Sequence, residues 1–151
     1  SIKNLTYIEM VEDYLQNFKH HCVPFPNLNE MLIELQNKSC ELGIITNGKG
    51  IFQLENIRTL GIEHYFKHIL ISETEGVSKP NPAIFHKAIN FFNVLPNECV
   101  YIGDHPHNDY TASRKIGMHA IWKKDSYWEN FEADHFIKDL SEIPTTLEII
   151  I

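Results

Sequence analysis

The sequence of 151 residues lacks the features that would place it in a membrane or in an oxidising compartment. No apolar run approaches the ~20 residues that a transmembrane helix needs, and no basic stretch precedes an apolar segment of the kind that directs secretion. Cysteine is scarce: Cys22, Cys40 and Cys99 are far apart and form no CxxC pair, so a disulfide framework is not expected. These absences favour a cytoplasmic protein with reduced thiols and no membrane partner.

Positive charge is also scarce. Lys and Arg number 13 against 20 Asp and Glu, which gives a formal net charge of -7. A surface of this sign repels the phosphate backbone of DNA and RNA, so nucleic acid is not expected as a partner, although one local positive pocket could hold a small phosphorylated ligand. Hydrophobic residues make up 43% and charged residues 22%, as in folded globular proteins, and the length suits a single core.

Helices and strands are expected to alternate along most of the chain. Apolar side chains three and four residues apart predict an amphipathic helix over residues 5–22, and Asn27 is expected to cap a second helix. Beyond it, short apolar runs alternate with helical segments, which predicts an α/β fold with a doubly wound parallel sheet. The expected strands are 42–46, 68–72, 99–102, 118–122 and 135–137, and the expected helices are 51–60, 82–92, one ending at 116, and a closing helix.

Parallel sheets place ligands at the carboxyl ends of their strands, and three unusual loops follow expected strands. The first is Thr46-Asn47-Gly48. A hydroxyl followed by unpaired backbone N–H groups can hold an anionic oxygen. Asn-Gly is also common in ordinary turns, so this loop alone leaves both interpretations open.

The second loop contains Lys79, followed by Pro-Asn-Pro. Asn81 as an N-cap and Pro82 at the first helical position explain the end of this loop as a helix start. That explanation does not include Lys79, whose ammonium group can offer a point charge to a phosphate.

The third loop begins at Gly103 and carries Asp104 and Asp109. Two carboxylates on one loop can converge on Mg²⁺, which prefers few carboxylates plus water and substrate oxygens. The alternative is a polar loop that caps the next helix, and it is stronger for Asp109 than for Asp104. Zinc binding by His105 and His107 is not expected, because no further ligand cluster accompanies them.

The three loops taken together resemble the motif pattern of the haloacid dehalogenase-like hydrolase superfamily. Its motifs occur here in the same order: a threonine after a buried strand, then Lys-Pro-x-Pro, then Gly-Asp-x-x-x-x-Asp. The resemblance covers residues 24–124, and residues 133–140 are similar to the last strand and helix of the family. It implies that residues 23–151 form the C-terminal portion of the α/β core, while residues 1–22 resemble the last helix of the α-helical cap that these enzymes insert.

The resemblance also implies roles for individual residues. The residues that it assigns to binding phosphoryl oxygens are Thr46, Asn47 and Gly48. Lys79 would neutralise the charge of the nucleophile and the phosphate. Asp104 and Asp109 would hold Mg²⁺ as cofactor. Thr46 and Lys79 would stabilise the charge of the transferring group and so act in catalysis. The pair of acids favours the metal-using, phosphatase-like branch over the metal-free dehalogenases.

One part of the family pattern is missing. The first motif, Asp-x-Asp-x-Thr or Val, supplies the nucleophile, but no two of the six aspartates here are separated by a single residue. In the family its strand lies between those that end at Thr46 and Asp104, and its removal would leave two facing ladders of unpaired backbone groups. We therefore expect a C-terminal part of a longer protein, whose missing strand comes from the N-terminal segment or from a second copy.

The resulting hypothesis is a Mg²⁺-dependent phosphatase that acts on a small phosphorylated metabolite through an aspartyl-phosphate, with this chain inactive alone. A phosphosugar mutase of the same fold and a non-catalytic phosphate-binding module remain alternatives. A receiver-type regulatory domain also combines acids, a hydroxyl and a lysine. Its acids come first in the sequence, which is the wrong order here.

Overall fold

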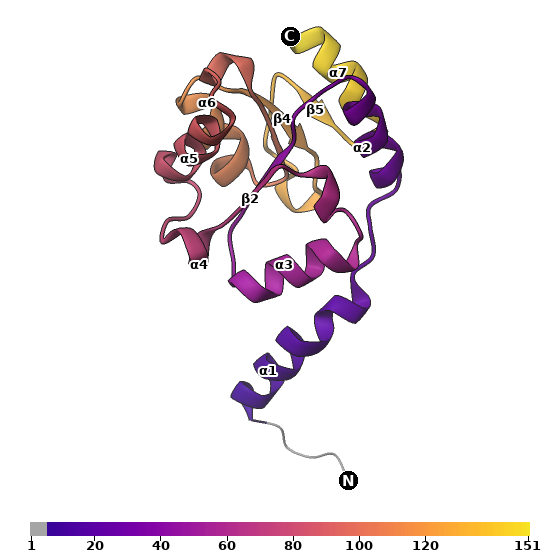
Figure 1. Ribbon diagram of the computed structural model, residues 1–151, viewed down its shortest axis with the longest axis vertical. Helices are drawn as coiled ribbons and strands as arrows, with labels where there is room; N and C mark the ends of the chain where they lie inside the picture. The colour runs from indigo at the N-terminus through magenta and orange to yellow at the C-terminus, as the bar shows by residue number, and fades with distance from the viewer. Residues whose placement is uncertain (1–5) are drawn as a thin grey trace.

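The computed structural model describes residues 6–151, and it shows an α/β fold in which helices flank short parallel strands (Figure 1). The strands are β1 (Gly43–Thr46), β2 (His68–Ile71), β3 (Val100–Gly103), β4 (His119–Lys123) and β5 (Phe136–Ile137). The helices are α1 (Tyr7–Asn17), α2 (Leu28–Asn37), α3 (Gly50–Thr59), α4 (Ser72–Glu75), α5 (Pro82–Phe92), α6 (Ala112–Lys115) and α7 (Ile143–Ile150). The expected alternation of strands and helices is confirmed.

The strands form two sheets, separated where the sequence analysis expects the central strand to be missing. β1 pairs with β2, and β3, β4 and β5 form a second sheet in that order, with every pair parallel. β1 and β3 are not hydrogen-bonded to each other, so within residues 6–151 each keeps one edge without a strand partner. The expected parallel sheet with a gap at its missing central strand is confirmed for the described residues, where the Tyr101 hydroxyl and the Ile45 carbonyl bridge the two halves in place of a backbone ladder.

The core lies on both faces of these strands. On one face, Leu32 of α2 and Ile143 of α7 pack with Ile121 of the central strand β4. On the other face, Ile84 and Phe85 of α5 pack with the β2 side chains and with α6. Figure 1 shows α2 and α7 on one side of the strands and α5 and α6 on the other. Burial of apolar surface on both faces stabilises the layered arrangement.

Local sequence signals account for several boundaries. α5 starts where Asn81 accepts the N–H of Ala83 at 3.0 Å, and Pro82 occupies the first turn. Asn27 precedes α2, but the expectation that its side chain caps the helix is wrong. Its backbone is left-handed, with φ 61°, and its amide donates instead to Asp139 at 2.7 Å.

The helix expected to end at residue 116 has two parts. A π-helical turn, Pro106–Thr111, leads into α6. The turn is wide because the carbonyl of His105 accepts the N–H groups of both Asp109 and Tyr110, at 3.0 and 3.4 Å. This turn is the element that carries Asp109 inward.

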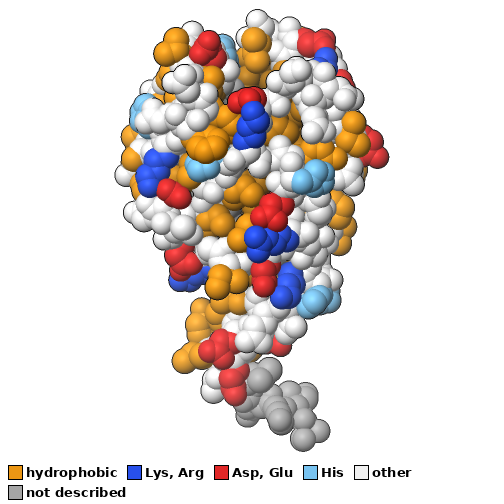
Figure 2. Space-filling view, in the orientation of Figure 1, with side chains coloured by type: hydrophobic (Ala, Val, Ile, Leu, Met, Phe, Trp, Pro, Cys, Tyr) orange, Lys and Arg blue, Asp and Glu red, His pale blue; other side chains and the backbone are white. Residues whose placement is uncertain are grey.

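The start of α1 stands away from the rest of the molecule (Figure 1). Residues 1–5 lie outside the described part, and with them residue 5, the first of the helix expected over 5–22. None of the α1 residues is buried, and Figure 2 shows hydrophobic side chains in this lower region of the molecule. The end of α1 and the turn after it meet α3, where Tyr14, Phe18 and Phe52 form an aromatic cluster and Lys19 pairs with Glu55 at 3.1 Å. No helix of residues 6–151 is long and apolar enough to cross a bilayer.

Candidate active site

Hydrogen bonds join the three loops that the sequence singles out. The Asn47 side chain, after β1, bonds the backbone of Lys79. The ammonium group of Lys79 in turn contacts Asp109, after β3. The structure therefore brings Asn47, Lys79 and Asp109 together at the carboxyl ends of the strands, although the residues of each pair are 30 or more positions apart in sequence.

Lys79 and Asp109 form a buried ion pair. The Nζ–Oδ1 distance is 2.6 Å, and the two side chains are only 11% and 5% exposed. Nζ also donates to the hydroxyl of Tyr101 at 3.0 Å. A positive charge that is partly withdrawn from water interacts more strongly with an anion than an exposed one does. Lys79 thus supplies a partly desolvated ammonium donor in an acidic protein, with its charge balanced by Asp109.

Tyr101 is a site residue that the sequence analysis missed. Its hydroxyl donates to the carbonyl of Ile45 on β1 at 3.2 Å, and it lies 3.4 Å from Asp109 Oδ1. Burial, followed by the negative charge of Asp109, raises the pKa of Tyr101 well above its usual value of 10.0. A signal existed in the sequence, since a tyrosine within a buried strand needs a partner for its hydroxyl.

The loop after β1 is held by its own contacts. Thr46 Oγ1 lies 3.2 Å from Gln53 Oε1, and the N–H of Gly48 donates to Ser72 Oγ at 2.9 Å. Gly48 has φ +145°, and a Cβ there would lie 2.7 Å from the Gln53 amide nitrogen. Only glycine fits this turn. The hydroxyl and the backbone N–H groups of this loop are the donor types that bind anionic oxygens.

Asp109 and Asp104 occupy different environments. Asp109 Oδ2 accepts the N–H of His105 at 3.0 Å, whereas the Asp104 carboxylate is exposed to solvent. The Asp104 carbonyl accepts from the indole N–H of Trp122 at 2.8 Å, which fixes the backbone beneath that carboxylate. A Cβ on Gly103 would lie 2.5 Å from Asp109 Cγ, so glycine at this position is needed for Asp109 to turn inward.

Two carboxylates provide the hard oxygen ligands that suit Mg²⁺ when water and a phosphate complete its shell. Residues 6–151 contain no group of three or more His, Cys, Asp or Glu side chains placed to hold a metal ion. The donor chemistry of Asp104 and Asp109 therefore fits Mg²⁺, but the remaining ligands would have to come from elsewhere.

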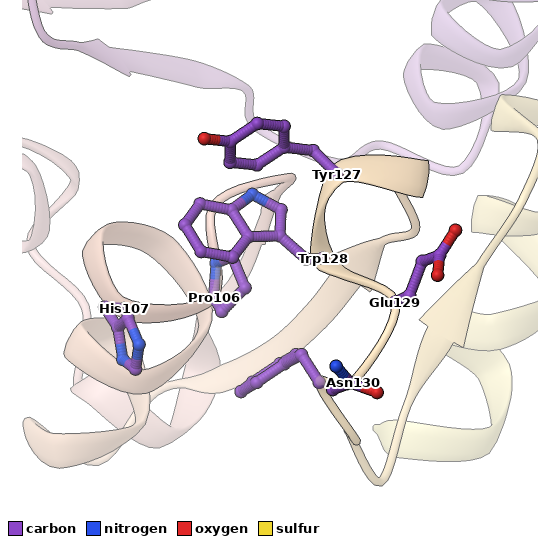
Figure 3. A pocket seen from close by; sticks show the side chains of 7 residues that line it. Pro106, His107, Tyr127, Trp128, Glu129 and Asn130 are labelled. Carbon is purple, nitrogen blue, oxygen red and sulfur yellow. The ribbon is translucent and has the colours of Figure 1, made fainter.

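An aromatic recess of about 260 Å³ adjoins the third loop (Figure 3). Its lining includes Pro106 and His107 of the π-helical turn together with Trp128 and Phe131. The ring of His105 lies 4.9 Å from that of Trp128, so the recess packs against the loop that carries Asp104. The sequence analysis did not single out these aromatic residues.

Comparison with known proteins shows what this chain is similar to. Residues 2–123 match the family model of the haloacid dehalogenase-like hydrolases. The glyceraldehyde 3-phosphate phosphatase of Pyrococcus furiosus is 36% identical over 130 residues, which are 83% of this chain and 53% of the relative. The chain thus spans about half the length of the curated relatives it matches.

Two solved structures are also similar. A HAD phosphatase from Thermococcus onnurineus superposes with a TM-score of 0.79 at 28% identity, covering 95% of this chain and 65% of that one. A 2-haloacid dehalogenase from Pseudomonas syringae pv. Tomato DC3000 gives a TM-score of 0.76 at 32% identity, covering 95% and 62%. Both superpositions cover 95% of this chain, so its fold is shared with both proteins.

Proposed function

Since this chain belongs to the haloacid dehalogenase-like hydrolases, we propose that it is the C-terminal part of a Mg²⁺-dependent phosphatase for a small phosphorylated metabolite. The observation that carries the proposal is Lys79, whose backbone is held by Asn47 and whose ammonium group is buried beside Asp109. An oriented, partly desolvated cation at the carboxyl edge of a parallel sheet suits a phosphate dianion. The phosphatase name of the Pyrococcus furiosus relative supports this reaction.

We assign each residue a role in that reaction. The Thr46 hydroxyl and the N–H groups of Asn47 and Gly48 bind the phosphoryl oxygens. Lys79 stabilises the negative charge that develops on the transferring group. Asp104 and Asp109 hold Mg²⁺, which when bound neutralises phosphate charge.

The nucleophile must come from outside the described residues. Among the described residues, the carboxylate that contacts the Lys79 ammonium is Asp109, which belongs to the proposed metal site. The proposed reaction is in-line attack on phosphorus by an aspartate of the missing segment, followed by hydrolysis of the aspartyl-phosphate by water. This chain alone is then inactive. In this proposal residues 1–22 belong to a helical cap and residues 23–151 to the core.

The test is an assay of the longer protein that contains this chain, with glyceraldehyde 3-phosphate, a hexose 1-phosphate and a 2-haloacid as substrates. We expect Mg²⁺-dependent release of inorganic phosphate, abolished by a chelator. Lys79→Ala and Asp104→Asn should each lower kcat about 10²- to 10³-fold. The control is Lys87→Ala, which removes an exposed lysine that bonds Glu75 at 2.7 Å on the neighbouring helix.

Other outcomes identify the alternatives. Isomerisation of the sugar phosphate without phosphate release would identify a mutase, and halide release would identify a dehalogenase. Phosphate binding without turnover would leave a non-catalytic module. Full activity of either site variant would refute the assignment of its residue.

A further inference from the structure

The loop after β4 forms a recess of about 260 Å³ beside the third loop, and aromatic rings dominate its lining. Tyr127 is 81% exposed and Trp128 is half-buried, so both rings present surface to solvent. Their centroids lie 5.1 Å apart in an edge-on arrangement. Aromatic side chains that stay exposed around a concave site are typical of ligand binding and contribute little to packing.

We propose that this recess binds a planar aromatic or heterocyclic ring of the substrate, so that the protein hydrolyses the phosphate monoester of a ring-bearing alcohol, such as a nucleoside. The proposal rests on the proposed function for the phosphate end of the substrate, whereas binding of the ring needs no turnover. Pockets that enclose a drug-sized ligand measure roughly 300–1,000 Å³. A recess of about 260 Å³ therefore suits a single ring system.

Direct contacts connect the recess to the proposed phosphate site. The ring of His105 lies 4.9 Å from that of Trp128, and the His105 N–H donates to Asp109 Oδ2 at 3.0 Å. The other oxygen of Asp109 contacts the Lys79 ammonium at 2.6 Å. Because β3 and β4 are parallel neighbours, the loops that follow them lie at the same edge of the sheet. A ligand with a sugar-sized linker between ring and phosphate therefore reaches both sites.

The recess itself offers the phosphate no cationic partner. Within the described part of the chain no lysine or arginine lines it, and Figure 3 shows the Glu129 side chain directed away from the Trp128 ring. Such a lining favours a neutral ring through stacking, which tolerates different rings because each has a π-face. The His107 imidazole and the Asn130 amide add donors and acceptors for the edge of a heterocycle.

The aromatic platform is held in place by the protein's own contacts. Phe131 packs edge-on against the buried ring of Trp122, with centroids 5.0 Å apart. The N–H of Tyr127 donates to Asp125 Oδ1 at 2.7 Å, and the N–H of Phe131 donates to the Trp128 carbonyl at 3.1 Å. Because these bonds fix the shape of the loop, binding of a ring costs little ordering entropy.

Adenosine and ribose are the first probes, because they differ only in the base. Added to the chain as it stands, adenosine should quench the fluorescence of Trp128 in a saturable manner, and ribose should not. The other tryptophan, Trp122, is 1% exposed and supplies a constant background. Absence of quenching up to the solubility limit of adenosine would overturn the proposal. Equal quenching by tetramethylammonium chloride would also overturn it, because it would identify a site for organic cations.

A matched pair of variants localises the binding. Tyr127→Leu removes an exposed ring from the lining, keeps the Trp128 reporter, and should weaken adenosine binding at least about fivefold. Phe136→Leu removes a 44% exposed ring outside the recess and should bind adenosine as the unaltered chain does. Trp128→Leu should weaken binding by a similar factor, measured by equilibrium dialysis. Should Trp128→Leu fail to fold, Tyr127→Leu decides the question, and unchanged binding in it would contradict the assignment.

In the longer protein the ring should appear in the substrate specificity. The kcat/KM for adenosine 5′-monophosphate or pyridoxal 5′-phosphate should exceed that for ribose 5-phosphate, and the better of the two identifies the kind of ring. Tyr127→Leu should lower the ratio of the better kcat/KM to that of ribose 5-phosphate about fivefold. Phe136→Leu should leave both values unchanged.

Failure of this proposal is separable from failure of the proposed function. Adenosine binding by this chain, combined with a longer protein that hydrolyses no phosphate ester, would overturn the phosphatase and support the recess. A longer protein that releases phosphate with equal kcat/KM from substrates with and without a ring would support the phosphatase and overturn the ring site.

Discussion

Asn47 holds the backbone of Lys79 with both ends of its amide. Its Nδ2 donates to the Lys79 carbonyl at 2.9 Å, and its Oδ1 accepts the Lys79 N–H at 2.9 Å. The next peptide bond, Lys79–Pro80, is cis. This clamp sets where the lysine side chain starts, so the position of its ammonium group beside Asp109 depends on a residue from another loop.

Asn47→Ala should lower kcat of the longer protein about thirtyfold, because two hydrogen bonds of about 1 kcal/mol each are lost. An indirect effect through Lys79 has a specific signature. In a Lys79→Ala background, Asn47→Ala should cause little further loss, as a double-mutant cycle measures. Fully additive losses would contradict the positioning role.

Gly103→Ala should displace Asp109, because the new Cβ would lie 2.5 Å from its Cγ. We expect the free energy of unfolding to fall by about 1–3 kcal/mol and activity to be lost with the ion pair. Gly61→Ala is the control. Gly61 has φ +71° with no neighbour within 4 Å of a Cβ, so it should suffer backbone strain alone and keep its kcat. Thermal unfolding and phosphate release measure the two effects.

Tyr101→Phe should reduce the pH dependence of stability at alkaline pH. In the folded chain the pKa of Tyr101 is raised well above 10.0, so near that pH the unfolded chain releases a proton that the folded chain retains. Stability therefore falls as pH rises through the unfolded value, and this contribution disappears in Tyr101→Phe. Urea unfolding across alkaline pH measures it, with Tyr127→Phe, which alters an 81% exposed residue, as control. Identical slopes in all three proteins would contradict the prediction.

Much of the local structure could be predicted from the sequence. Helix α5 has the expected bounds of 82–92, because Asn81 and Pro82 are start signals that act within one turn. The strands were located to within about a residue, since each is a short apolar run between turn residues. The loops carrying Thr46, Lys79 and Asp104 were singled out for the same reason: their chemistry is unusual in its local setting.

Contacts between distant segments could not be predicted in this way. Asn27 has the residue type of an N-cap, yet it bonds Asp139, which lies 112 positions away. The hydrogen bond from Lys79 to Tyr101 likewise forms only when the loop that carries Lys79 meets strand β3. Local propensities contain no information about which side chain a distant strand will present.

The sequence by itself determined the α/β alternation, the three polar loops and the shortage of aspartates at a strand end, because these depend on residue type and spacing. Only the tertiary structure decided that Lys79 is clamped by Asn47 against Asp109. It alone also placed an aromatic recess beside the loop that carries Asp104. The physical reason is that strand pairing and buried ion pairs are set by the packing of whole layers, whose energies outweigh any local preference.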